Sequence, residues 1–176
     1  YVLQIKKTPI VVNDSRGFYT SRVFSTYVME GIAMLGEGQH PHVIEMAGLK
    51  AGMPVGPLAL TDEVSMKLMD HIRRQTEKDL QAEGKPVPKH PGFAVCEKLL
   101  EANRPGKAAG AGFYEYPQGG TKYLWPELTK MFPQQAPLSQ QEMIDRILIV
   151  QALDTVRCLE EGVLRSVADA NIGSIF

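Results

Sequence analysis

The sequence predicts a mainly α-helical fold, and three observations support this prediction. Apolar residues recur at three- and four-residue intervals between Gly17 and Leu35, which is the spacing of one helix face. Short runs rich in glycine and proline separate several further helical stretches. A second long helix is expected after Leu138, where Ser139 and Glu142 have the spacing of a capping box.

The first long helix follows a short apolar segment. Residues 10–12 predict a strand, and either Asp14 or Ser15 can cap the helix that follows by accepting a backbone N–H. Gly36 and Gly38 can end that helix in a left-handed conformation. A strand this apolar normally lies inside a larger parallel sheet, so we expect its sheet to lie outside this chain.

Composition limits the possible classes of function. The chain has 176 residues and a net charge of −1, which suits one or two small domains and offers no basic excess for nucleic acid. No apolar run approaches the ~20 residues of a membrane span, so we expect a soluble protein. Cys96 and Cys158 lack metal-site or disulfide spacing, which favours a reducing cytosol or mitochondrial matrix.

Further elements are expected along the rest of the chain. Gly48 is predicted to end a short helix that begins at His42, and Pro41 suits its first turn. Pro117–Pro137 reads as an ordered connector that contains Trp125. The remaining predictions are a helix over 58–69, a charged amphipathic helix over 67–83, a helix over 90–103, and an extended segment over 112–116.

Several residue types that often carry chemistry have simpler structural interpretations. His40 and His42 lack the third ligand of a catalytic zinc site, which favours an exposed loop. His71 and His90 have no partner at triad-like spacing. Asp62, a lone carboxylate in the first turns of a helix, is interpreted as structural.

The glycine-rich run at 106–112 has neither the Walker spacing nor the GxGxxG fingerprint, and the run at 119–122 fails the same test. We interpret the first run as a turn that leads into the extended segment. From the residues alone, no catalytic set is visible.

Four sequence blocks together resemble the C-terminal region of 3-hydroxyacyl-CoA dehydrogenases, in the form found in multifunctional enzymes of fatty acid β-oxidation. They occur in the expected order, and together they span nearly the whole chain. The blocks are KTPIVVNDSRGFYTSR (7–22), GMPVGPLALTDEV (52–64), GKAAGAGFYEY (106–116) and RILIVQALDTVRCLEEGVLRSVADANIGSIF (146–176).

This resemblance implies a function. Such enzymes oxidise 3-hydroxyacyl-CoA to 3-ketoacyl-CoA with NAD, and their catalytic His–Glu pair and NAD site lie in a preceding Rossmann domain. The fragment alone is therefore expected to be inactive. In the family motif GFxxNR an Asn contacts substrate, and Ser21 stands at that position here. Phe176 stands near a family Tyr that contacts substrate, so Ser21 and Phe176 are the candidate substrate-binding residues.

The resemblance also implies a domain organisation of two related helical units. Shifting the sequence by 124 residues aligns Ile32 with Val156 and Gly38 with Gly162, in a pattern of long helix, glycine stop and shorter helix. We predict a remnant of the NAD-binding domain over 1–14, a first helical unit with its connector over 15–137, and the start of a second unit over 138–176. Expected partners are acyl-CoA, the preceding domain, and a thiolase subunit or a second copy.

Two other functions stay open. The chain could be a non-catalytic helical assembly module for subunit association, in which case Ser21 and residues 52–57 would be buried in a helix interface. It could instead be an unrelated helical adaptor, which one uninterrupted helix over 13–22 would favour.

Overall fold

The computed structural model describes residues 2–175, which form two compact units. One unit comprises the described residues up to Tyr27 together with those from Leu148 onward, and the other comprises Val28–Ile147. Helices α1 (Thr20–Gly36) and α7 (Gln140–Glu160) contribute residues to both. The prediction of a mainly α-helical fold is confirmed, because the described sheet has only two short strands.

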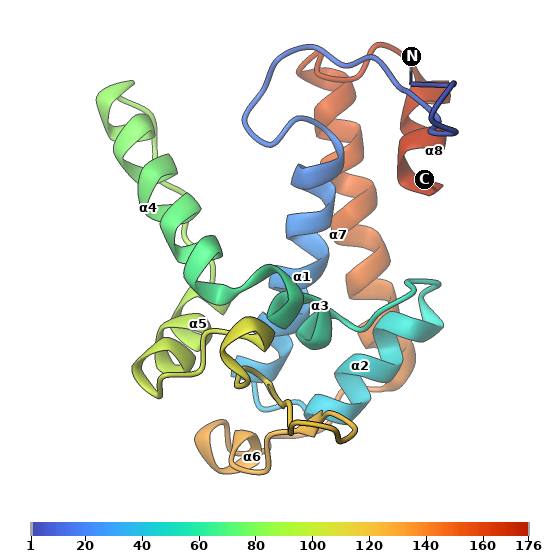
Figure 1. Cartoon of the computed structure of the whole chain (residues 1–176). Coiled ribbons are helices and arrows are strands. Elements are labelled where there is room, and N and C mark those ends of the chain that lie inside the picture. The colour runs from blue at the N-terminus through green and yellow to red at the C-terminus, as the bar shows by residue number, and fades with distance from the viewer. Residues whose placement is uncertain (1, 176) are drawn as a thin grey trace. The chain divides into compact units, whose positions relative to one another are not determined.

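The first unit joins the segment before α1 to the end of α7 and to α8 (Val167–Ile175). Its core contains buried residues from these three parts, and α8 lies beside the N-terminal segment (Figure 1). The backbone N–H of Asn13 donates to the carbonyl of Val163 at 2.8 Å. The buried core residues are Tyr19, Cys158, Val163, Leu164 and Ala170.

The strand predicted over 10–12 is wrong. Only Val12 pairs, in a single antiparallel bridge with Leu164, and Val11 is exposed. One paired residue cannot extend a ladder, because the segment finds no continuous neighbouring strand among the described residues.

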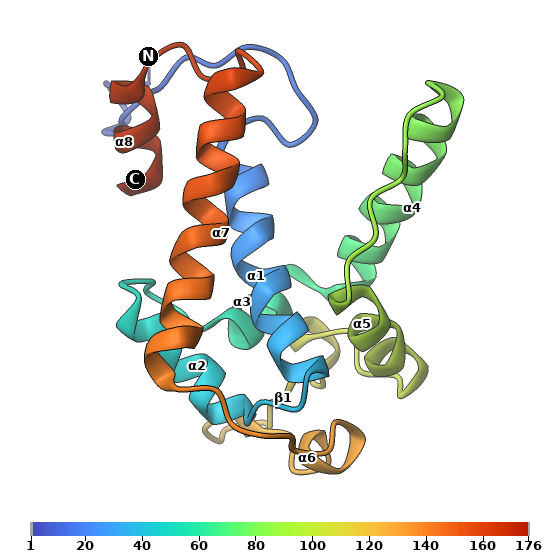
Figure 2. The ribbon, with the colours of Figure 1, turned by 180° about the vertical axis from the view of Figure 1, so that it is seen from behind.

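The second unit contains most of the shorter elements. Strands β1 and β2 pair antiparallel, with Tyr114 opposite Leu124 and Glu115 opposite Tyr123. The chain after α4 runs back along that helix toward α5 (Figure 2). The elements are α2 (Pro41–Lys50), α3 (Pro57–Val64), α4 (Met66–Ala82), α5 (Gly92–Glu101), the 3₁₀ helix η1 (Lys107–Ala109), β1 (Tyr114–Glu115), β2 (Tyr123–Leu124) and α6 (Leu128–Met131).

Two predicted helix boundaries were wrong for identifiable reasons. Helix α2 continues through the buried Gly48 to Lys50, because Gly52 (φ +96°) supplies the left-handed residue that ends it. The helix predicted over 58–69 breaks at Ser65, which has φ +82° and separates α3 from α4.

Two predicted helix starts, at Ser139 and at Pro41, are present, whereas the predicted cap by Asp14 or Ser15 is wrong because α1 begins only at Thr20. The hydroxyl of Ser139 accepts from the backbone N–H of Glu142 at 3.1 Å, which is one of the two hydrogen bonds of a capping box. Pro41 occupies the first turn of α2.

Gly38 and Gly162 both have positive φ and both precede a shorter helix, which matches the element pattern of the predicted repeat. Across residues 2–175, no helix combines the length and apolar character of a bilayer span.

Candidate functional site

The motif over 17–22 leads into α1 through two consecutive left-handed residues. Gly17 has φ +73° and Phe18 has φ +50°, so the helix begins at Thr20 rather than at the predicted Gly17. A left-handed conformation disfavours a bulky side chain, and Phe18 is 52% exposed. Residues 13–22 are not one uninterrupted helix, so the feature that would favour the adaptor interpretation is absent.

Ser21 lies in the first turn of α1 and is exposed. Its carbonyl accepts a hydrogen bond from the hydroxyl of Ser25 at 2.7 Å. Ser25 thus makes the back-bond to the preceding turn that is common for a helical serine. The Ser21 side chain is exposed, and its hydroxyl can both donate and accept a hydrogen bond.

Arg22, the next residue, is held by two carboxylates of the first unit. Its Nη1 lies 2.5 Å from Oε2 of Glu161, and its Nη2 lies 3.1 Å from Oδ1 of Asp154. The hydrogen bond to Glu161 raises the pKa of Arg22 above its ordinary value, with Asp154 adding to the effect. This clamp could not be predicted from the sequence, because 132 residues separate Arg22 from Asp154.

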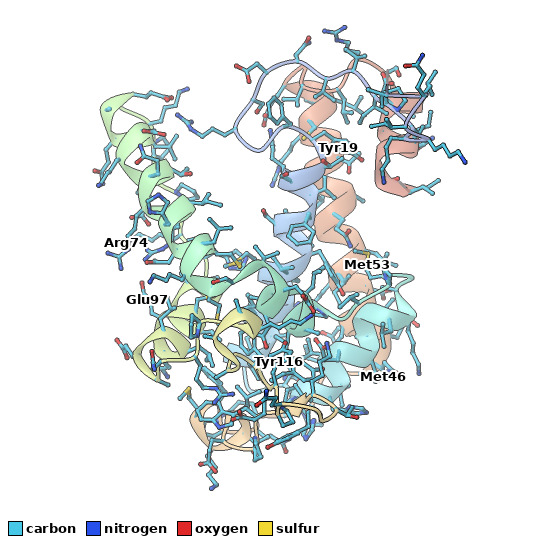
Figure 3. The ribbon with its side chains drawn as sticks, in the orientation of Figure 1. Tyr19, Met46, Met53, Arg74, Glu97 and Tyr116 are labelled. Atoms are coloured by element: carbon cyan, nitrogen blue, oxygen red, sulfur yellow. The ribbon has the colours of Figure 1, made fainter. Side chains whose placement is uncertain are left out.

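Tyr19, labelled in Figure 3, is a second anchor of the motif. The ring is buried, and its hydroxyl donates to the carbonyl of Ala170 at 3.0 Å. The same hydroxyl lies 3.3 Å from Oγ1 of Thr155. Upstream, Nδ2 of Asn13 donates to the carbonyl of Gly162 at 2.7 Å, so the approach to the helix is also fixed.

Asp62, in the second unit, is fully engaged in the fold. Its carboxylate accepts from the backbone N–H groups of Phe113 and Tyr114, both at 2.9 Å, and from the Tyr116 hydroxyl at 3.0 Å. Burial raises its pKa, while these hydrogen bonds and the charge of Arg104 act in the opposite direction. The contacts fit the structural role that we assigned to Asp62 from the sequence.

Glu45 plays a comparable role that sequence reasoning missed. Its Oε1 accepts from the N–H of Leu58 at 2.7 Å and of Ala59 at 3.3 Å, which caps the first turn of α3. Its Oε2 accepts from the Tyr114 hydroxyl at 2.8 Å. Burial raises the pKa of Glu45, and the three hydrogen bonds oppose that rise. A glutamate in the middle of α2 gives no local sequence signal for capping a different helix.

Two histidines, His40 and His90, accept hydrogen bonds from backbone N–H groups. Nδ1 of His40 accepts from the N–H of His42 at 3.2 Å and so caps α2, and Nδ1 of His90 accepts from the N–H of Gly92 at 3.1 Å. Burial lowers the pKa of His90. Within residues 2–175, no group of three His, Cys, Asp or Glu side chains could hold a metal ion.

The described residues do not fit NAD. A dinucleotide site needs a parallel sheet with a glycine-rich turn at a helix N-terminus, whereas the sheet in residues 2–175 is one antiparallel pair. The glycine-rich run instead forms η1 and a turn, with Gly106 and Gly110 at positive φ. Phe176, the second candidate substrate-binding residue, lies outside the described residues.

Fold and site together define a mainly helical domain that presents a polar motif at a helix start. The sequence model of the family "3-hydroxyacyl-CoA dehydrogenase, C-terminal domain" matches residues 17–116, and the chain belongs to this family. The resemblance recognised from the four sequence blocks is thereby confirmed.

Similar proteins include two bacterial proteins named fatty acid oxidation complex subunit alpha. The one from Vibrio cholerae is 36% identical over 173 residues, which cover 97% of this chain and 23% of the relative. The one from Shewanella loihica is 37% identical over 173 residues, which cover 97% of this chain and 24% of the relative. The chain thus spans about a quarter of the length of these relatives.

Proposed function

We propose that this chain is the substrate-binding C-terminal part of an NAD-dependent 3-hydroxyacyl-CoA dehydrogenase that oxidises 3-hydroxyacyl-CoA to 3-ketoacyl-CoA in fatty acid β-oxidation. The observation that carries the proposal is the exposed Ser21 hydroxyl in a motif that is anchored by Tyr19 and Arg22. The family membership supports it, and so do the names of the relatives.

In this proposal the chain binds the substrate, and a preceding domain carries out the oxidation. A preceding Rossmann domain would hold NAD and a His–Glu pair that moves the proton of the substrate hydroxyl. Ser21 would hydrogen-bond the oxygen at the reacting carbon, with a shorter reach than the Asn of the family motif. Phe176 would add an apolar contact to the acyl chain. The isolated chain would then bind acyl-CoA without turnover.

The domain division belongs to the same proposal. Residues 1–14 would end the NAD-binding domain, 15–137 would form the first helical unit, and 138–176 would begin a second copy of that unit. The enzyme would act in the cytoplasm of a bacterium or in a mitochondrial matrix, in company with a thiolase subunit or a second copy.

Calorimetric titration of acetoacetyl-CoA into the chain tests the binding role. We expect saturable binding by the wild type and about fivefold weaker binding by Ser21→Ala, the loss typical of one hydrogen bond. Ser174→Ala is the matched control, because Ser174 is also an exposed helical serine but lies outside the motif. Equal affinities of wild type and Ser21→Ala would contradict the proposal.

One observation favours the assembly module as the alternative function. Ile149, Leu153 and Val156 lie at helical spacing on α7 and are 56%, 51% and 50% exposed, which is unusual for a helix face that has no partner. A second copy of the chain would cover this stripe. Sedimentation equilibrium tests this function: a dimer that Leu153→Glu dissociates would support it, and a wild-type monomer at every concentration used would reject it.

A further inference from the structure

Ser21 lies in the first turn of α1, and the first turn is one of the least stable parts of a helix. The first four N–H groups of a helix have no intrahelical acceptor, and helix ends open more easily than helix centres. A side chain that must meet a ligand in a defined direction needs such an end to be held. Two neighbouring side chains, Tyr19 and Arg22, provide that hold.

The two anchors face the protein at the start of α1, whereas Ser21 faces outward. Tyr19 is buried and Arg22 is half-buried, while Thr20 and Ser21 are exposed. This follows from the helical period, because residues three apart share a face and their neighbours in sequence do not. The inward face is fixed against the protein, and the outward face carries the hydroxyl.

The anchoring residues come from one region of the first unit, residues 154–173, which includes the end of α7 and most of α8. Arg22 binds Asp154 and Glu161, and Tyr19 donates to the Ala170 carbonyl. Packing is equally close at Gly173, where an added Cβ would lie 2.9 Å from Cε1 of Tyr19. The ring thus has no room to shift toward α8.

We propose that Tyr19 and Arg22 are positioning residues, through which the region 154–173 fixes the direction of Ser21 toward an acyl-CoA ligand. The inference rests on the proposed function. It gives the last part of the chain a role in the substrate site, in addition to any role in assembly.

The charges of Glu161 and Asp154 and the burial of Asp154 indicate that both carboxylates hold Arg22 firmly. The hydrogen bond from Arg22 lowers the pKa of Glu161 below its ordinary value. The side chain of Asp154 is only 10% exposed, so losing Arg22 would leave a nearly buried carboxylate without this cation. The structure therefore couples the order of the motif to the charge of residue 22.

The test is a double-mutant cycle on the 176-residue chain, with acetoacetyl-CoA affinity as the readout. Arg22→Met should weaken binding about as much as Ser21→Ala, and Arg22→Lys should recover part of the loss. In the Ser21→Ala background, Arg22→Met should cause no further loss of affinity, because Ser21→Ala has already removed the hydroxyl that Arg22 positions. Amide hydrogen exchange at residues 17–22 should quicken in Arg22→Met.

Arg146→Met is the matched control. Arg146 also bridges two carboxylates, Glu30 and Glu37, but within the second unit. Arg146→Met should lower the free energy of unfolding and leave the affinity for acetoacetyl-CoA unchanged. Should Arg22→Met fail to fold, Glu161→Gln replaces it, because Glu161 is half-exposed and its loss leaves Asp154 paired.

The outcomes separate this inference from the function on which it rests. If Ser21→Ala weakens binding while a folded Arg22→Met or Glu161→Gln binds like the wild type, the positioning role is overturned and the proposed function stands. The same holds if Arg22→Met adds its full loss in the Ser21→Ala background. If the wild type does not bind acetoacetyl-CoA at all, both are overturned together.

Discussion

The backbone of Gly112 lies directly against the carboxylate of Asp62, with no space for a Cβ between them. The same carboxylate accepts from the N–H groups of the next two residues, so glycine is required where the turn meets α3. This contact joins the second and third of the four sequence blocks that carry the resemblance.

Gly112→Ala should lower the free energy of unfolding by about 3 kcal/mol, because a methyl group would push Asp62 off its buried donors. Urea unfolding measures the change. Gly119→Ala is the control, since its Cβ would meet open space and would cost only the strain of a left-handed backbone. Equal effects of the two substitutions would mean that the close packing at Gly112 does not matter.

Asp62→Asn should destabilise the chain by about 2–4 kcal/mol, because an amide NH₂ would face one of the two backbone donors and leave it unsatisfied. Tyr116→Phe removes only the third donor and should cost about 1 kcal/mol. The same unfolding experiment compares the two. A loss for Asp62→Asn no greater than that for Tyr116→Phe would argue against the structural role of the carboxylate.

Most of the helical architecture could be predicted from local sequence patterns. The helical period located α1 and α7, and Ser139 and Pro41 marked helix starts. Two of the exceptions arise from left-handed residues other than glycine. Phe18 and Ser65 adopt positive φ and reset helix boundaries, and neither residue type indicates this conformation.

The site was predictable only in part. The motif identified Ser21 as a candidate, but the residues that hold its helix turn lie more than 130 residues away in sequence, as with Arg22 and Asp154. Likewise, Glu45 caps a helix that begins twelve residues later. Such contacts depend on tertiary packing, for which a single sequence carries no periodic signal.

Glu45 should make stability depend on pH in an unusual direction. Burial raises its folded pKa, so the folded state holds the proton more tightly than the unfolded state. Its contribution is therefore complete below the ordinary pKa of about 4 and is lost as pH rises through the raised value. Unfolding at several pH values should show wild type losing stability relative to Glu45→Gln as pH increases.

Glu45→Gln keeps an acceptor for the α3 donors and removes the ionisation, so the difference between the two proteins isolates this group. The other carboxylates with shifted pKa values are common to both proteins and cancel. A difference that stays constant from acid to neutral pH would show that Glu45 titrates alike in the folded and unfolded states.

The two cysteines should resist modification in the native state. Both thiols are buried and free, and burial raises the pKa of Cys96 to about 12. Burial also raises the pKa of Cys158, although Arg22 acts against this. Because the thiolate is the reactive form, Ellman's reagent should label both only as the chain unfolds. Rapid labelling of one thiol in the folded protein would contradict the packing around it.

The central claim is that this chain supplies a substrate-binding surface to redox chemistry performed elsewhere. The direct measurement is NADH-dependent reduction of acetoacetyl-CoA by the chain alone, and by a chimera in which it replaces the matching 173 residues of the Vibrio cholerae relative. The account predicts no turnover by the chain, turnover by the chimera, and a KM that Ser21→Ala raises and Ser21→Asn does not. Turnover by the isolated chain would contradict the account. So would a folded chimera whose KM is unchanged by Ser21→Ala.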